Sequence, residues 1–163
     1  MQLAFTEMDT PVGVLKLVAH DHALVAVMWD NEDHKRVRLA SLVRQDDHPI
    51  LLKTQQQLQE YFAGQRQQFD VPLDFEGTEF QKKVWQALLS IPFGETRSYK
   101  QIAEQVGSEN AMRAVGAANG KNPISIIAPC HRVVGASGKL VGFAGGLDNK
   151  AILLKLESST SKV

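Results

Sequence analysis

A single cysteine, Cys130, stands in the segment Pro129-Cys130-His131-Arg132-Val133, directly after the apolar residues 124–128. A thiol beside an imidazole, which is a base, and a guanidinium, which is a fixed positive charge, has neighbours that can favour the nucleophilic thiolate. The pattern therefore indicates a cysteine nucleophile. The competing interpretation is a buried structural thiol, because free cysteine is among the most buried residue types.

A cysteine nucleophile needs a base, and the base needs a group that orients it. His131 is the nearest base in the sequence. If this segment is extended, neighbouring side chains point to opposite faces, so His131 needs a turn or a bridging water to reach the sulfur. Glu157 is the candidate carboxylate for holding His131, because its apolar neighbours would pin the last helix against the core. The alternative is a solvated glutamate at a helix end.

The two halves of the chain carry opposite charges. Residues 1–77 contain 7 lysines and arginines against 12 aspartates and glutamates, a net charge of −5. Residues 78–163 contain 11 against 6, a net charge of +5, and include Cys130. This segregation favours either a polyanion bound to the C-terminal half or two domains of opposite charge docked on each other.

Length and composition predict an ordinary soluble protein. The chain has 163 residues, of which 44% are hydrophobic and 22% charged, enough for one or two compact units. No apolar run approaches the roughly 20 residues of a membrane helix, and residues 1–7 lack the features of a signal peptide. A free thiol suits a reducing compartment. We therefore expect a cytoplasmic protein that does not contact a membrane.

The first half predicts a small α+β unit. Three apolar, partly β-branched runs are the expected strands of an antiparallel sheet: residues 2–8, 14–18 and 23–29. His20-Asp21-His22 suits a hairpin turn. Apolar residues at helical spacing over 50–62 predict a helix that stops at Gly64. The alternating residues 69–75 predict a short edge segment leading to a domain boundary at Gly77.

Past Gly77 the pattern predicts helices. Thr78 and Gln81 form a capping box, followed by an apolar stripe made of Phe80, Val84, Leu88 and Ile91. Residues 92–94, Pro-Phe-Gly, end this helix. Two short helices over 99–106 and 109–118, joined at Gly107-Ser108, resemble a helix-turn-helix, with ordinary core packing as the alternative.

Five glycines fall within residues 135–146. Glycine permits close approach of the backbone to a ligand, so this loop can face a planar substrate beside the thiol. The alternative is a surface hairpin. A last helix is expected over 147–156, ending at Glu157, and residues 158–163 are expected to form a flexible tail.

Several ordered blocks of the C-terminal half resemble one family. The blocks are Phe93-Gly94-Glu95, Ser98-Tyr99, Arg113-Ala114-Val115-Gly116, Asn122-Pro123, the segment around Cys130, and Gly142-Phe143-Ala144-Gly145-Gly146. They resemble the O6-alkylguanine-DNA alkyltransferases, also called methylated-DNA-protein-cysteine methyltransferases. The resemblance is strong over residues 78–157 and covers the first half in general plan.

The resemblance implies an α+β fold. A small N-terminal antiparallel sheet with a helix, ribonuclease-H-like, occupies residues 1–77. A mostly helical domain with a helix-turn-helix occupies residues 78–157. The implied activity is DNA repair by stoichiometric, irreversible transfer of the alkyl group of O6-alkylguanine, with O4-alkylthymine as a candidate second substrate. The implied partner is double-stranded DNA with its damaged nucleotide flipped out, bound by a monomer without a cofactor.

The resemblance also implies roles for single residues. Cys130 is similar to the acceptor thiolate, His131 to the base acting through a water, and Glu157 to the carboxylate that holds it. Asn122 matches the hinge asparagine. Tyr99 matches the tyrosine that rotates the phosphate and helps to protonate the departing guanine.

Arg113 matches the arginine that enters the base stack where the nucleotide leaves. The small residues of the second helix suit binding through the minor groove: Ala114, Gly116, Ala117 and Ala118. The substrate-pocket positions are Val133, Phe143, Ala144 and Lys150.

The sequence also departs from the family pattern. Because Cys130 is the only cysteine, we expect no cysteine-bound zinc, and His20 and His22 are expected to be turn residues. The chain leaves no room for the zinc-binding regulatory domain of some relatives. Phe143 and Ala144 stand where some members have Tyr and Ser.

Two other functions remain open from the sequence. A cysteine hydrolase built on Cys130, His131 and Glu157 would act repeatedly on acyl or peptide substrates. A non-catalytic DNA-binding module would bind damaged DNA without changing it.

Overall fold

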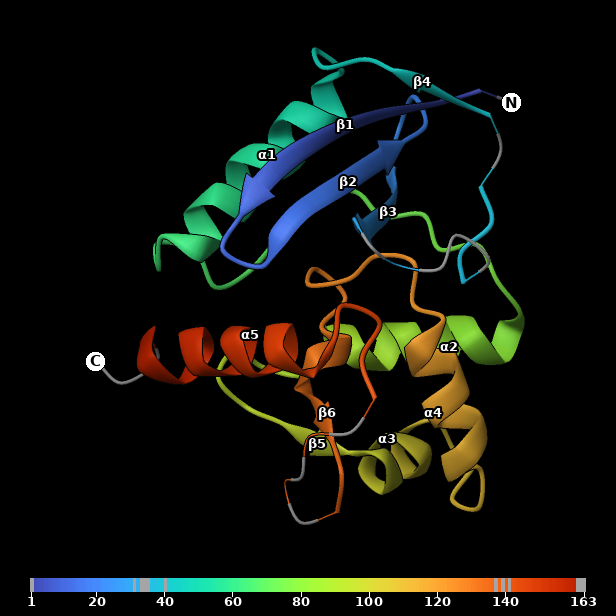
Figure 1. Ribbon diagram of the computed structural model, residues 1–163. Helices are drawn as coiled ribbons and strands as arrows, with labels where there is room; N and C mark the ends of the chain where they lie inside the picture. Colours follow the sequence, from blue (N-terminus) through green and yellow to red (C-terminus); the bar gives the residue numbers. More distant parts are fainter. Residues whose placement is uncertain are drawn as a thin grey trace.

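A curved sheet with one helix lies above a group of helices in the computed structural model (Figure 1). The structure describes residues 2–30, 32, 36–39, 41–136, 138, 140 and 142–160. Its two parts follow the order predicted from the sequence, an α+β unit followed by a mostly helical one.

The described sheet has four strands in the order β3-β2-β1-β4. The strands are β1 (Leu3–Thr10), β2 (Gly13–Ala19), β3 (Leu24–Trp29) and β4 (Leu42–Arg44). The three predicted strands pair antiparallel, but β4 pairs parallel with β1. Strand β4 was not predicted, because its three residues are too few, and too exposed, to show an alternating pattern.

Helix α1 (Pro49–Phe62) packs against the sheet through Leu51, Leu58 and Tyr61. His48 caps its first turn by accepting a hydrogen bond from the Ile50 N–H. Gly64 follows with φ +75°, a conformation that glycine adopts readily. The predicted helix and its stop are confirmed.

The expected edge segment over 69–75 pairs with the sheet at a single bridge, between Leu73 and Leu24. The Leu24 N–H donates to the Pro72 carbonyl, and the Asp74 N–H donates back to Leu24. Pro72 has no N–H to extend the ladder. His20 lies in a turn and bonds Asp74 at 2.8 Å, which fastens this segment to the sheet.

The second half contains α2 (Glu79–Leu89), β5 (Arg97–Ser98), α3 (Tyr99–Gln105), α4 (Met112–Gly120), a 3-10 turn (Cys130–Arg132), β6 (Val133–Val134) and α5 (Leu147–Thr160). The predicted capping box of Thr78 and Gln81 is present. A second box, Ser98 with Gln101, begins α3. Helices α3 and α4 pack on each other, and Gly107 turns the chain between them with φ +79°.

Helix α5 corrects the expected end of the last helix, because it continues through residues 158–160. Neither Gly nor Pro follows Glu157 to stop it. The rest of the predicted tail, residues 161–163, lies outside the described residues. Among the described helices, none has the length and apolar character needed to cross a membrane.

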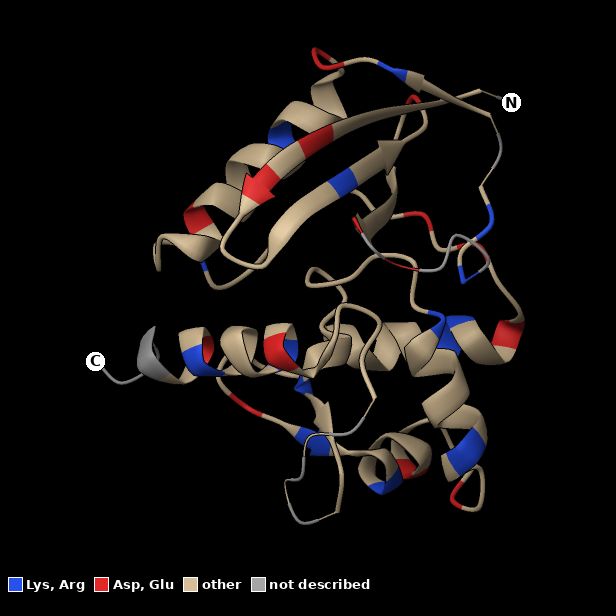
Figure 2. Cartoon of the chain, in the orientation of Figure 1, with Lys and Arg blue, Asp and Glu red and all other residues tan. Residues whose placement is uncertain are grey.

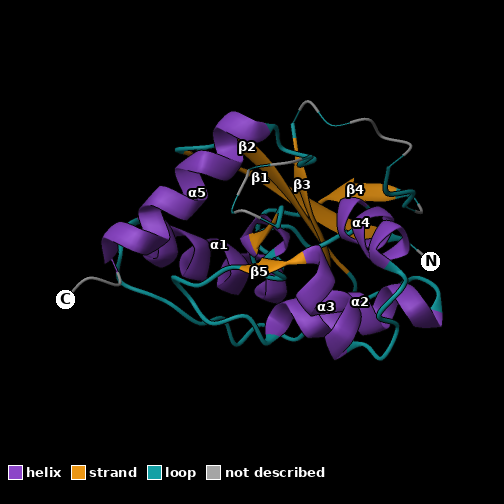
Figure 3. Cartoon of the chain, turned by 90° about the horizontal axis from the view of Figure 1, so that it is seen from below, coloured by secondary structure: helices purple, strands orange, loops and turns teal. Residues whose placement is uncertain are grey.

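One continuous core joins the two halves. Leu17 and Leu24 of the sheet, Leu58 of α1, Val84 of α2 and Leu153 of α5 belong to the same buried cluster. Seen from below, α1 and α5 lie on one side and α2 and α3 on the other (Figure 3). Acidic residues are frequent in the half that contains the sheet and basic residues in the lower, helical half (Figure 2).

Gly77, where the halves meet, leaves no room for a side chain. A Cβ there would lie 2.6 Å from the Trp85 ring. We expect Gly77→Ala to lower the free energy of unfolding by about 1–3 kcal/mol, since the ring must shift within a packed core. Urea denaturation measures this change. Gly120→Ala is the control, because a Cβ there meets nothing within 4 Å; equal stability of the two variants would contradict the steric argument.

Candidate active site

The loop before Cys130 is held by the side chain of Asn122. Its amide N–H donates to the Ala128 carbonyl at 2.8 Å, and its amide oxygen accepts from the Ile124 N–H at 3.0 Å. Ile126 within this loop has φ +72°, a left-handed conformation that is strained for a β-branched residue. Asn122 is fully buried. Its hydrogen bonds therefore stabilise a strained loop that ends at the cysteine.

Strand β3 of the first half supports the same loop. Val27 forms a bridge with Ile124, with its N–H donating to the Pro123 carbonyl at 2.9 Å. The Trp29 indole N–H donates to the Ser125 hydroxyl at 3.1 Å. The first half is thus part of the framework of the site.

Cys130 opens a 3-10 turn, which corrects the extended segment considered from the sequence. With about three residues per turn, neighbouring side chains no longer point to opposite faces. The thiol is 3% exposed. Burial raises its pKa, against the lowering effects of the Asn122 amide and the charges of Arg36 and Lys150. The resting sulfur is therefore a thiol that needs a base, whereas the sequence analysis expected neighbours that favour the thiolate.

The Glu157 carboxylate joins the two residues that follow the cysteine. His131 Nε2 lies 2.7 Å from Glu157 Oε2. Arg132 donates from Nε to Oε1 at 2.8 Å and from its terminal nitrogen to Oε2 at 3.0 Å. All three side chains are buried. Such an ion pair stabilises a fold only when its hydrogen bonds are complete.

The charges of this cluster follow from burial and pairing. Burial alone raises the pKa of Glu157, but hydrogen bonds and charges from His131 and Arg132 outweigh it and lower the pKa to about 2. Burial lowers the pKa of His131, although Glu157 opposes this. Because Arg132 carries a permanent charge, Glu157 stays ionised even when His131 has lost its proton. The lowered pKa of His131 favours the neutral imidazole at pH 7.

The tautomer of His131 follows from its partner. An ionised carboxylate accepts hydrogen bonds, so Nε2 carries the proton. Nδ1 is buried and has no hydrogen-bond partner within the described part of the chain. The ring therefore presents an unprotonated nitrogen on the side away from Glu157.

The predicted pocket residues come from β6, the glycine-rich loop and α5. Lys150 is fully buried, and its Nζ donates to the Val133 carbonyl at 2.6 Å. The same nitrogen lies 5.9 Å from the centre of the Phe143 ring. Phe143 packs edge-on against Trp29, and Ala144 packs against the core. Phe143 and its loop thus rest on the first half of the chain.

Tyr99 and Arg113 line a hollow of about 410 Å³ together with Gly116 and Gly142. Cys130 does not line this hollow. Burial raises the pKa of Tyr99, and the nearby Cys130 adds to the rise. Tyr99 therefore lines the hollow and is close enough to Cys130 to feel its charge.

The exposed side of α4 carries Arg113, Ala114 and Ala117. Ala118 is buried, so it does not share this surface as the resemblance suggested. The indole N–H of the buried Trp85 donates to the Ala118 carbonyl at 2.8 Å, so Ala118 lies on the side of α4 that faces the core.

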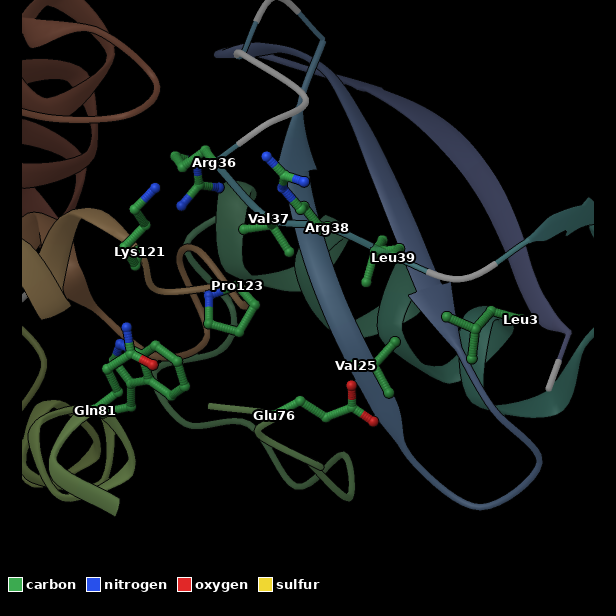
Figure 4. A pocket seen from close by; sticks show the side chains of 11 residues that line it. Leu3, Val25, Arg36, Val37, Arg38, Leu39, Glu76, Gln81, Lys121 and Pro123 are labelled. Atoms are coloured by element: carbon green, nitrogen blue, oxygen red, sulfur yellow. The ribbon is translucent and has the colours of Figure 1, made fainter. Parts of the chain in front are cut away.

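A second pocket of about 210 Å³ lies where the sheet meets α2 (Figure 4). Arg36, Arg38, Glu76 and Lys121 contribute its charged side chains. None of the predicted site residues lines it. This pocket is therefore separate from the thiol.

Sequence reasoning missed four residues of the site. Arg132 was interpreted through its charge on the thiol, yet it pairs with Glu157. Arg36 donates to the Asn122 carbonyl at 2.7 Å, Tyr61 donates to Glu157 at 2.6 Å, and Asn119 Nδ2 lies 3.5 Å from the Cys130 carbonyl. Arg132 was visible in the motif. No local pattern indicated the other three contacts.

Comparisons with known proteins agree for both halves. The model of the 6-O-methylguanine DNA methyltransferase DNA-binding domain matches residues 79–159, and that of the ribonuclease-like domain matches residues 3–75. The methylated-DNA-protein-cysteine methyltransferase of Mycobacterium leprae is 50% identical over 150 residues, covering 92% of this chain and 89% of that protein. The constitutive one of Bacillus subtilis is 44% identical over 162 residues and covers 97% of both.

Solved structures give the same result. The crystal structure of Mycobacterium tuberculosis OGT in complex with DNA has a TM-score of 0.88 and 45% identity, and the match covers 98% of this chain and 94% of that one. The chain therefore belongs to the O6-methylguanine DNA methyltransferase family.

The low pKa of Glu157 predicts a specific acid sensitivity. Its folded-state value of about 2 lies below the ordinary 4.5, so its stabilising effect is present above pH 4.5 and is lost as the pH falls toward 2. We expect Glu157→Gln to be less stable at pH 7 by about 3 kcal/mol or more, because buried Arg132 loses its anion. We also expect it to lack this part of the acid dependence.

Urea denaturation at several pH values checks the slope below pH 4.5. Glu104→Gln, which changes an exposed carboxylate on α3, is the matched control. A wild-type slope that Glu157→Gln reproduces below pH 4.5 would contradict the assignment.

Proposed function

We propose that this chain repairs alkylated DNA by moving the alkyl group of O6-alkylguanine irreversibly to Cys130. The observation that carries the proposal is the buried series Cys130, His131 and Glu157, in which the histidine keeps one nitrogen unprotonated. The family membership of both halves supports it. O4-alkylthymine is a second candidate substrate. The need for a reduced thiol supports a cytoplasmic location.

Proton transfer starts the reaction. Because burial raises the pKa of Cys130, the thiol must lose its proton as it reacts. His131 Nδ1 takes this proton through a bridging water, and Glu157 stabilises the imidazolium that forms. Lys150 supplies a nearby positive charge for the developing thiolate.

Alkyl transfer is a single displacement. The sulfur bonds to the alkyl carbon, the bond from that carbon to O6 breaks, and its electron pair stays on guanine. Tyr99 donates a proton to the leaving base, and the proton held on His131 then returns through water to the Tyr99 oxygen, so that overall the alkyl group replaces the thiol hydrogen. The product is a thioether, which water does not readily hydrolyse. One molecule of protein therefore acts once.

In this proposal, α3, α4 and the hollow beside them bind the DNA. Helices α3 and α4 serve as the helix-turn-helix, with the small exposed residues Ala114 and Ala117 against the minor groove. The damaged nucleotide flips out at a cost of a few kcal/mol, and Arg113 fills its place. Cys130 is 3% exposed, so the alkyl group reaches the sulfur only after the residues that cover it move.

A mass measurement separates this function from its alternatives. After incubation with duplex DNA carrying O6-methylguanine, we expect the intact protein to gain one methyl group on the peptide that contains Cys130. Cys130→Ser should gain none. Release of product over many turnovers by an unmodified protein would indicate a hydrolase. Unchanged DNA and unchanged protein would indicate a binding module.

Arg113→Ala tests the flipping step. We expect it to slow transfer from duplex DNA about tenfold or more, because a side chain must fill the space that the flipped nucleotide leaves in the base stack. Reaction with a free O6-alkylguanine base needs no such filling and should be nearly unchanged. Arg44→Ala, which removes a half-exposed arginine from the distant strand β4, controls for lost charge. Equal losses on both substrates would exclude the flipping role. Rates come from quenched reactions analysed by mass spectrometry.

A further inference from the structure

Tyr61 brings the first half of the chain into contact with the proton-transfer series. Its hydroxyl donates to Glu157 Oε2 at 2.6 Å, across 96 residues of sequence. The end of α1 that carries Tyr61 lies over α5, which carries Glu157 (Figure 1). Oε2 is also the oxygen bonded to His131 Nε2. The tyrosine and the histidine therefore share one acceptor atom.

The ring of Tyr61 is fixed in place. It is fully buried and packs against Phe62, Phe69 and Phe93, with ring centres 5.2, 5.6 and 6.2 Å away. Phe93 in turn lies under the Arg132 guanidinium, 5.6 Å from its ring centre. The aromatic packing aims the hydroxyl, and it does not depend on the hydrogen bond.

Tyr61 is a permanent donor to Glu157. Burial raises the pKa of Tyr61 far above its ordinary value, and the charge of Glu157 and the hydrogen bond to it add to the rise. The phenol therefore keeps its proton at neutral pH. Its O–H dipole always points toward the carboxylate.

The charged and titratable groups around His131 come from three elements. Glu157 and Lys150 belong to α5, Arg132 follows His131 in the 3-10 turn, and Tyr61 belongs to α1. Glu157 favours the imidazolium, whereas Arg132 and Lys150 disfavour it. A hydrogen bond from Tyr61 draws negative charge on Oε2 toward the phenol and away from His131.

We propose that Tyr61 is a positioning residue of the transfer reaction, whose hydroxyl fixes the Glu157 carboxylate and thereby sets the orientation and the proton affinity of His131. This inference rests on the proposed role of His131 as the base. It assigns to the first half of the chain a part in proton transfer, beyond its support of the loop before Cys130.

Tyr61→Phe is the test, because it removes the hydroxyl and keeps the packed ring. Without the donor, more charge faces His131, and the imidazolium is stabilised. The acid side of the pH dependence of the transfer rate should then move to higher pH by about half a unit to one unit. The rate near neutral pH should fall about three- to tenfold, because the carboxylate is less firmly oriented.

Thr54→Val is the matched control. It removes another fully buried hydroxyl from α1, one that donates to the Ile50 carbonyl. It should lower stability without moving the pH profile. A Tyr61→Phe profile with the same acid midpoint as wild type would overturn the proposal, whatever the change in stability.

A second measurement does not depend on alkyl transfer. Nitrogen-15 NMR of the His131 ring reports its tautomer and protonation, and Tyr61→Phe should shift the Nε2 signal while Thr54→Val should not. If wild type transfers no alkyl group but the Nε2 signal still responds to Tyr61→Phe, the proposed function fails and the link from Tyr61 to His131 stands. An Nε2 signal identical in wild type and Tyr61→Phe overturns the link.

Discussion

The buried carboxylate of Glu157 is the constraint around which the site is arranged. An ionised group in the core costs several kcal/mol unless nearby charge and hydrogen bonds compensate it. Arg132 supplies the compensating charge, and the hydrogen bonds come from three residues, one of them on α1. The 3-10 turn allows His131 and Arg132 to reach the same carboxylate, which an extended strand would prevent. The turn that satisfies the buried carboxylate is therefore the same turn that orients the histidine.

Both halves of the chain build the site, although most of its side chains come from the second half. The residues with proposed chemical roles lie almost entirely after Gly77, but the side chains and backbone that hold them come from both halves. Strand β3 pairs with the loop before the cysteine, and Trp29 supports both Ser125 and Phe143. A Cβ on Gly145 would lie 2.5 Å from the Trp29 ring, so this glycine allows the glycine-rich loop to approach the sheet.

Local signals explain what could be predicted from the sequence. The capping box at Thr78, the stripe of α2 and the stop at Gly64 depend on residues a few positions apart, and all are present. Glu157 lies within hydrogen-bond distance of His131, and the buried Leu153 on the same helix packs in the core, as the apolar neighbours of Glu157 suggested. The contacts of Trp29 with Ser125 and of Tyr61 with Glu157 each span 96 residues, and no periodicity encodes them. The protonated state of Cys130 also depended on burial, which composition alone does not give.

The separation of charge between the halves makes this neutral molecule an electric dipole. With −5 on one half and +5 on the other, a polyanion exerts little net pull on the whole molecule and a turning force on its two ends. The field of a polyanion therefore favours approach with the basic helical half toward the phosphates and the acidic sheet away from them. Orientation at a distance raises the share of collisions in which the helical half meets the duplex first. Added salt should shorten the range of this steering to about the 8–10 Å Debye length, and so act on encounter more than on the buried chemistry.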